Sequence, residues 1–178
     1  VAGDGLRRLI DEDGIRGVTS NPSIFAAAIA GSDDYDQAVQ ELLAASPSLS
    51  TEGLYERLAV EDIRLAADQL RPVYEASGGN DGFVSLEVSP HLAADSGGTV
   101  DEARRLWHLV ERPNLMIKVP ATAAGMPAVE SLIGEGVNVN VTLIFSLAHY
   151  DATVAAYLRG LERCPRPDRT ASVASFFV

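Results

Sequence analysis

The chain has 178 residues, of which 47% are hydrophobic and 22% charged, a composition typical of a soluble globular protein. Its net charge of −11 would repel a phosphate backbone, so we expect no nucleic-acid partner. No apolar stretch is as long as a membrane span and no signal peptide is evident, so we expect a cytoplasmic protein with no membrane partner, folded as one domain over residues 1–178.

Apolar strands alternate with helical patterns along the first half of the chain. A turn is expected at Asn21-Pro22, directly after the first strand. The helices marked by apolar residues at helical spacing are expected to pack against a core. In chain order, the predicted elements are a helix at Leu6–Asp13, a strand at Gly17–Thr19, helices around Tyr35–Leu43 and Leu54–Tyr74, and a strand at Phe83–Val88.

The same alternation continues in the second half. Thr99 and Glu102 have the spacing of a capping box, which predicts a helix that begins there and ends before Pro113. Ser146 is a candidate cap for a later helix. The elements that follow are a strand at Leu115–Val119, a helix carrying Val129, Leu132 and Ile133, a strand at Val137–Ile144, a helix reaching Leu161, and a strand at Ala171–Val178.

The strand and helix order predicts a parallel sheet with helical crossovers, for which an open doubly wound sheet and a (β/α)8 TIM barrel are the two candidates. Polar residues recur at every second position in Phe83–Val88 and in Val137–Thr142. Strands covered by helices on both faces read as nearly continuous apolar runs, so this pattern favours the barrel. A barrel needs eight strands and about 250 residues, and five units are present here, so we expect an internal portion of a larger domain.

Lys118 is the sole lysine of the chain and lies inside the apolar run Leu115–Val119. Burial disfavours the charged ammonium form of a lysine, and a neutral amine can attack a carbonyl. The sequence therefore suggests a lysine that forms a Schiff base. A structural ion pair, or a stem that packs while the ammonium reaches the strand end, is the alternative.

Other polar side chains stand at or near the strand ends and would converge at one mouth of a parallel barrel. Each also has a plain structural interpretation, such as a turn for Asn21 or an ion pair with Lys118 for Glu87. Iminium chemistry needs an acid/base and donors that orient substrate hydroxyls. The candidates are Thr19, Asn21, Glu87, Asn140, Thr142 and Ser175.

The histidines and the single cysteine give little support for a metal site. His91, His108 and His149 lie far apart without paired spacing, and Cys164 alone cannot form an intramolecular disulfide or a thiolate cluster. We expect no metal ion.

Five segments, in order, resemble the transaldolase family from end to end of the chain. The longest is Leu115-Met116-Ile117-Lys118-Val119-Pro120-Ala121-Thr122. The others are Gly17–Phe25, Val84–Val88, Asn138–Leu143 and Ala174–Val178.

The resemblance implies transfer of a dihydroxyacetone unit from sedoheptulose 7-phosphate to glyceraldehyde 3-phosphate, giving erythrose 4-phosphate and fructose 6-phosphate. Lys118 would be the Schiff-base nucleophile, and Glu87 with Thr142 would position the catalytic water. Thr19, Asn21, Asn140 and Ser175 would contact the sugar. Small phosphorylated sugars are the implied partners, no cofactor is implied, and a homo-oligomer is left open.

The family also carries an acid/base aspartate on its first barrel strand and a phosphate-binding arginine after the Ser-Phe-Phe-Val segment. Neither matches a residue of this sequence. Two alternatives therefore remain, namely an enzyme like fructose-6-phosphate aldolase and a noncatalytic fragment that binds sugar phosphates. The pairing of Glu87 with Thr142 favours transfer over simple aldol cleavage.

Overall fold

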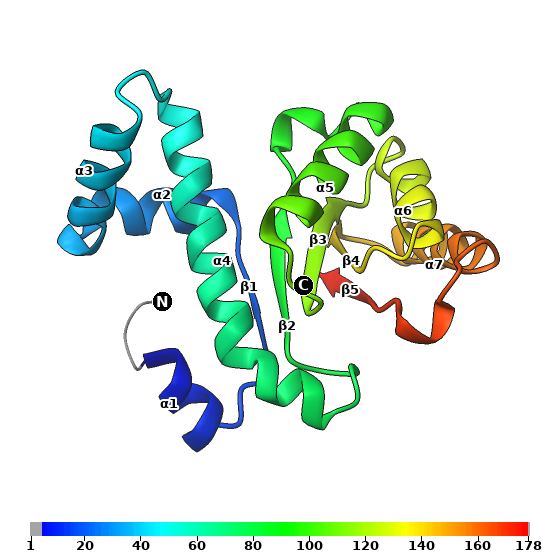
Figure 1. Ribbon diagram of the computed structural model, residues 1–178. Coiled ribbons are helices and arrows are strands. Elements are labelled where there is room, and N and C mark those ends of the chain that lie inside the picture. The colour runs from blue at the N-terminus through cyan, green and yellow to red at the C-terminus, as the bar shows by residue number, and fades with distance from the viewer. Residues whose placement is uncertain (1–4, 178) are drawn as a thin grey trace.

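The computed structural model describes residues 5–177 and contains a parallel sheet curled into half of a barrel, with helices on its outer side (Figure 1). The sheet runs in the sequential order β1-β2-β3-β4-β5. Its strands are β1 (Gly17–Thr19), β2 (Phe83–Glu87), β3 (Leu115–Pro120), β4 (Val139–Ile144) and β5 (Ser172–Phe176).

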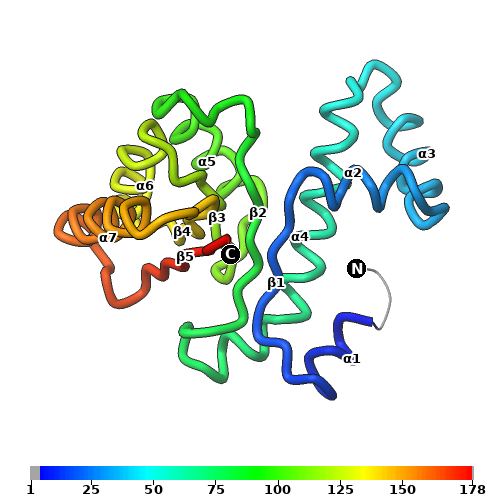
Figure 2. The backbone as a smooth tube through the Cα atoms, turned by 180° about the vertical axis from the view of Figure 1, so that it is seen from behind, coloured from blue at the N-terminus to red at the C-terminus, as the bar shows by residue number. Residues whose placement is uncertain are grey.

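Helices connect the strands and form two groups. Figure 2 shows the first four helices on one side of the molecule and the last three on the other, in agreement with the view from the front. The helices are α1 (Gly5–Glu12), α2 (Pro22–Gly31), α3 (Asp36–Ala45), α4 (Thr51–Ala76), α5 (Ser96–Val110), α6 (Gly125–Gly134) and α7 (Leu147–Leu161). Short 3-10 turns lie at Asp33–Tyr35, Pro90–Leu92 and Pro167–Arg169. Among the described helices, none combines the length and apolarity that crossing a bilayer requires.

The strand order confirms the predicted barrel class and rules out the doubly wound alternative. A doubly wound sheet has a switch point where the strand order reverses, and this sheet has none. Right-handed crossovers between sequential parallel neighbours place their helices on the same face. The other face is therefore left concave and free for polar side chains.

The hydrophobic core lies between the sheet and the outer helices. In β3 the side chains of Leu115, Ile117 and Val119 point outward and are fully buried, and Val129 and Leu132 of α6 belong to the same core. Each such aliphatic side chain stabilises the fold by about 1.5–3 kcal/mol relative to exposure. This packing fixes the parity of β3 and so directs Lys118 to the concave face.

One helix was missed at the sequence level. The sequence predicts a turn at Asn21-Pro22, but Pro22 begins α2 and the Asn21 side chain caps it by accepting a hydrogen bond of 2.8 Å from the amide of Ile24. Asn-Pro suits this position because asparagine is a favoured N-cap and proline lacks an amide hydrogen that the first turn would leave unpaired.

The predicted capping box at Thr99 was wrong. Helix α5 begins at Ser96, and Asp95 is its N-cap, with a carboxylate oxygen that accepts from the amide of Gly98 at 3.0 Å. Thr99 lies inside the helix, where it is buried and donates its hydroxyl to the carbonyl of Leu92. By contrast, Ser146 caps α7 as predicted.

Several strand boundaries also differ from the prediction by one or two residues, since β2 ends at Glu87, β3 ends at Pro120 and β5 begins at Ser172. Strand β4 begins at Val139, two residues after the predicted start, and Asn138 just before it donates its side-chain amide to the carbonyls of Pro113 and Leu115. The prediction for the last strand included Val178, which lies outside the described residues.

Candidate active site

The register of the sheet brings the predicted polar residues onto its concave face. Glu87 of β2 is paired with Lys118 of β3, and Lys118 is paired with Asn140 of β4. Thr19 is likewise paired with Ser85. Because paired residues of parallel strands point to the same side, Glu87, Lys118 and Asn140 form a polar line across the inside of the half barrel, with Thr19 and Ser85 in the row before it.

Lys118 is held by two acceptors, one on the neighbouring strand β2 and one in the residue that follows β1. Its Nζ donates to Oε2 of Glu87 at 3.0 Å and to the carbonyl oxygen of Ser20 at 2.9 Å. The side chains of Lys118 and Glu87 are 9% and 15% exposed, so the ion pair is largely removed from water. Truncating one partner of such a pair leaves a poorly compensated charge, which makes the pair sensitive to substitution.

Asn140 links the other polar residues of the line. Its Nδ2 donates to the hydroxyl of Ser85 at 3.0 Å, and its Oδ1 accepts from the hydroxyl of Ser175 at 2.8 Å. The amide is therefore fixed in orientation by groups from β2 and β5. Ser85 was not among the predicted site residues, although it lies two positions before Glu87 and so shares its face.

The remaining predicted residues lie at the same strand ends. Thr19 is exposed on the concave face, and Thr142 is buried with its backbone carbonyl bonded to the amide of Ala121. Asn21 stands after β1 and caps α2. Within residues 5–177, no hydrogen bond joins these three side chains to Lys118 or Glu87. Their predicted roles toward substrate or water stay predictions.

Tyr55 of α4 is a further group close to the site that the sequence did not indicate. Burial, and next the negative charge of Glu87, raises the pKa of the Tyr55 phenol. Only the placement of α4 beside β2 reveals this proximity, because α4 reads as a packing helix in the sequence.

A cavity of about 360 Å³ opens on the concave face beside the polar line, with Thr19, Ser85, Met116, Asn140 and Ser175 in its lining. This volume lies in the range of small-molecule sites, which are typically about 300–1,000 Å³. The space is therefore large enough for a small substrate within reach of Asn140 and Ser175.

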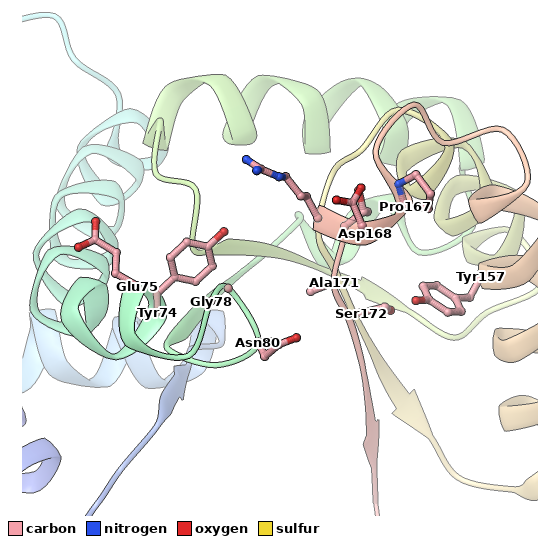
Figure 3. A pocket seen from close by; sticks show the side chains of 12 residues that line it. Tyr74, Glu75, Gly78, Asn80, Tyr157, Pro167, Asp168, Ala171 and Ser172 are labelled. Atoms are coloured by element: carbon pink, nitrogen blue, oxygen red, sulfur yellow. The ribbon is translucent and has the colours of Figure 1, made fainter.

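Another cavity, of about 770 Å³, lies at the opposite ends of the strands (Figure 3). Tyr74, Glu75 and Asn80 line it from the segment before β2, and Asp168 and Ser172 line it from the segment that leads into β5. In barrels the catalytic groups stand at the carboxyl ends of the strands, whereas the amino ends serve stability. This cavity is therefore not part of the candidate active site.

No cluster of three or more histidine, cysteine, aspartate or glutamate side chains that could hold a metal ion occurs in the part of the chain that the structure describes. The charged partner of Lys118 is a carboxylate. The concave face therefore presents an amine, a carboxylate and hydrogen-bonding groups as its reactive and binding groups.

Comparison with known proteins gives a consistent assignment over the whole chain. The family model for transaldolase/fructose-6-phosphate aldolase matches residues 2–178. The chain is 53% identical over 177 residues to a transaldolase of Thermobifida fusca, covering 97% of this chain and 48% of that protein. It is 51% identical to a transaldolase of Thiobacillus denitrificans, covering 97% of this chain and 49% of that protein.

A third relative, named transaldolase 2, of a Nostoc species, is 50% identical, with coverage of 97% of this chain and 46% of the relative. The chain thus spans about half the length of the curated relatives that it matches.

Proposed function

The chain belongs to the transaldolase/fructose-6-phosphate aldolase family, and we propose that it acts as a transaldolase through a Schiff base on Lys118. The observation that carries the proposal is the buried contact of Lys118 with Glu87 at the concave face, in line with Asn140. The donor would be sedoheptulose 7-phosphate and the acceptor glyceraldehyde 3-phosphate. Both are small phosphorylated sugars, and their reaction belongs to the pentose phosphate pathway.

The first chemical step is the attack of the Lys118 amine on the ketone carbon of the donor. The amine must lose a proton before it attacks, and Glu87 is the acidic group in contact with Nζ at 3.0 Å. The resulting carbinolamine loses its hydroxyl as water and becomes an iminium ion, which requires an acid that protonates the leaving oxygen. Glu87, with a water shared with Thr142, is our candidate for both transfers.

The C4 hydroxyl of the donor then passes its proton to the Glu87 carboxylate through the shared water, the C3–C4 bond breaks, and the iminium ion accepts the electron pair of that bond. This cleavage frees erythrose 4-phosphate and leaves a three-carbon dihydroxyacetone unit on Lys118 as an enamine. Addition of that unit to the aldehyde of glyceraldehyde 3-phosphate, followed by hydrolysis, gives fructose 6-phosphate and restores the amine. The protein-bound iminium is itself the electron sink, so the proposed route uses no cofactor.

Hydrogen-bonding residues of the concave face would hold the three-carbon unit between the two half-reactions. Asn140 and Ser175 already orient each other through a hydrogen bond. Binding the sugar hydroxyls would therefore cost these side chains little further conformational entropy. Thr19 and Asn21 stand at the end of β1 and complete the proposed contacts to sugar.

A product assay distinguishes the proposal from its alternatives. Incubation with sedoheptulose 7-phosphate and glyceraldehyde 3-phosphate should give fructose 6-phosphate and erythrose 4-phosphate in equal amounts, measured by mass spectrometry. Release of free dihydroxyacetone from fructose 6-phosphate, without transfer, would favour the aldolase alternative. A folded chain that gives neither set of products would favour a noncatalytic sugar-phosphate-binding role.

A homo-oligomer is part of the proposal. Within residues 5–177, β5 is paired with β4 alone, and Val173, Phe176 and Phe177 on or beside it are exposed. An unpaired strand edge with apolar side chains is a surface suited to association. We further propose that the protein works in the cytoplasm, where phosphorylated sugars are metabolised.

A further inference from the structure

A third cavity lies beside the candidate active site, on the outer side of β2 between α4 and α5, and shares Glu87 with that site. Its volume is about 490 Å³. Figure 1 shows β2 flanked by these two helices. The apolar part of its wall is formed by Ala59 and Val60 of α4, Leu86 and Val88 of β2, and Leu106 of α5. Small-molecule sites are typically cavities of this size with apolar walls and a few polar groups.

The polar part of the wall is strongly acidic. Four carboxylates line the cavity, those of Glu52, Glu56, Glu87 and Glu102. Arg105 forms ion pairs with Glu56 and Glu102 at the surface, and Glu87 is paired with Lys118 on the concave face. Apart from that pair, three carboxylates stand against one cation, which leaves the cavity with a negative potential.

Among the polar groups of the wall, Glu52 and Tyr55 at the start of α4 are free to bind a ligand. Within residues 5–177, Glu52 forms no ion pair and the Tyr55 hydroxyl forms no hydrogen bond. Tyr55 can donate or accept, and Glu52 accepts only. Both belong to the first turns of α4 and stand one helical turn apart, which puts them on one side of the cavity.

The charge of the wall decides what kind of ligand fits. A phosphorylated sugar would be repelled by the carboxylates, so the cavity is not a second substrate site. An uncharged hydrocarbon would fill the apolar part and leave Glu52 and Tyr55 without partners. A compact hydrocarbon that carries one protonated amine satisfies both parts of the wall.

We propose that this cavity binds a small organic cation, with its hydrocarbon body against Leu86, Val88 and Leu106 and its ammonium group against Glu52 and the Tyr55 hydroxyl. The site lies on the helix side of the sheet, whereas Lys118 faces the concave side. It goes beyond the proposed transaldolase activity and uses no step of that reaction.

The test uses cyclohexylmethylamine, which is protonated at pH 7, and its neutral counterpart cyclohexylmethanol. Titration calorimetry on the whole chain should give one saturable site for the amine, with a dissociation constant below about 1 mM. The alcohol should bind at least about five-fold more weakly, because it lacks the charge-assisted hydrogen bond to Glu52.

Variants locate the bound amine. Glu52→Gln should weaken binding about five-fold, and Glu162→Gln, a matched change at the far end of α7, should leave it unchanged. Ala59→Phe places a ring in the cavity and should abolish binding. If melting curves show that Ala59→Phe does not fold, the comparison of Glu52→Gln with Glu162→Gln decides.

Binding should persist in Lys118→Ala, which has no catalytic amine, so a failure of the proposed function leaves this test intact. The proposal is overturned if the amine shows no saturable binding, if the alcohol binds as tightly, or if Glu52→Gln has no effect.

Discussion

At the residue scale, the contact between Lys118 and Glu87 is compatible with two roles, one structural and one catalytic. A buried ion pair can be purely structural, and its presence alone does not identify a catalytic amine. What distinguishes this pair is its surroundings, since Asn140 lies next in register and bonds to Ser175 and Ser85. A pair that served only stability would need no such line of oriented hydroxyl and amide groups beside it.

Glu87→Gln separates the structural from the chemical role. The amide keeps the size of the side chain and a hydrogen-bonding oxygen for Lys118, but it cannot accept a proton. We expect the adduct with fructose 6-phosphate to form more slowly, because Glu87 is our candidate for the proton transfers that make it, and the rate of transfer, which requires further proton transfers, to fall more, by about 10²-fold or more. Single-turnover and steady-state assays measure the two effects. Equal loss of both would indicate a disrupted site in place of a missing acid/base.

Tyr35 provides a prediction for stability at alkaline pH. Burial, followed by a hydrogen bond to the carboxylate of buried Asp62, raises the pKa of Tyr35 to about 12. The folded state therefore holds the phenol proton more tightly than the unfolded chain. The protonated phenol therefore stabilises the folded state fully below pH 10.0, the ordinary pKa of tyrosine in an unfolded chain. This stabilisation is lost as the pH rises towards 12.

Tyr35→Phe should remove this contribution and leave the Asp62 carboxylate without its donor, a loss of about 1–2 kcal/mol near neutral pH. Urea unfolding of both proteins at pH 8, 10 and 11.5 measures the difference. The difference in the free energy of unfolding between parent and variant should become smaller as the pH rises. A difference that becomes larger would contradict the raised pKa of Tyr35 in the folded state.

Most of the site residues could be predicted because strand parity is a local property of the sequence. Alternation in Phe83–Val88 put Glu87 on the polar face, and the same alternation contains Ser85, which was overlooked. Tyr55 could not be found in this way. Its proximity to Glu87 depends on how α4 packs against the sheet, and no local pattern encodes that contact.

At the scale of elements, the packing of α6 on α7 depends on Gly160. A Cβ atom at this position would come within 2.8 Å of the carbonyl oxygen of Glu130 and of the Ile133 Cβ. Gly160→Ala should therefore force the helices apart and lower the free energy of unfolding by about 1–3 kcal/mol.

Gly134→Ala is the matched control, because the nearest atom to its Cβ would be 3.6 Å away. There the higher helix propensity of alanine should dominate, with a gain of up to about 1 kcal/mol. Urea denaturation measures both variants. Equal effects would contradict the close approach of the two helices at Gly160.

Elements with strong periodicity were predicted well, and those with weak periodicity were not. Helix α2 was missed because its sequence, Pro22–Gly31, is rich in alanine and apolar throughout, without a single stripe that contrasts with a polar face. The capping box at Thr99 failed for a different reason. Asp95, four residues earlier, offers a cap that lets the helix begin sooner and buries Thr99 within it.

At the scale of the whole molecule, the curled sheet unites groups from β1 to β5 on one concave face. Sequence separations of 31 between Glu87 and Lys118 and of 35 between Asn140 and Ser175 are closed by hydrogen bonds. The barrel class was predictable because alternating polarity requires one solvated face, and sequential strand order then follows from short right-handed crossovers. The depth and position of the cavities could not be predicted, since they depend on how all the layers pack.

The most direct test of the central claim is chemical trapping of the lysine. Incubation of the chain with fructose 6-phosphate and sodium borohydride should reduce the iminium ion to a stable secondary amine, which intact-mass and peptide mass spectrometry would place on Lys118. The Lys118→Ala variant should give no adduct. A folded parent chain that forms no adduct, or an adduct that persists in Lys118→Ala, would contradict a Schiff base at this residue.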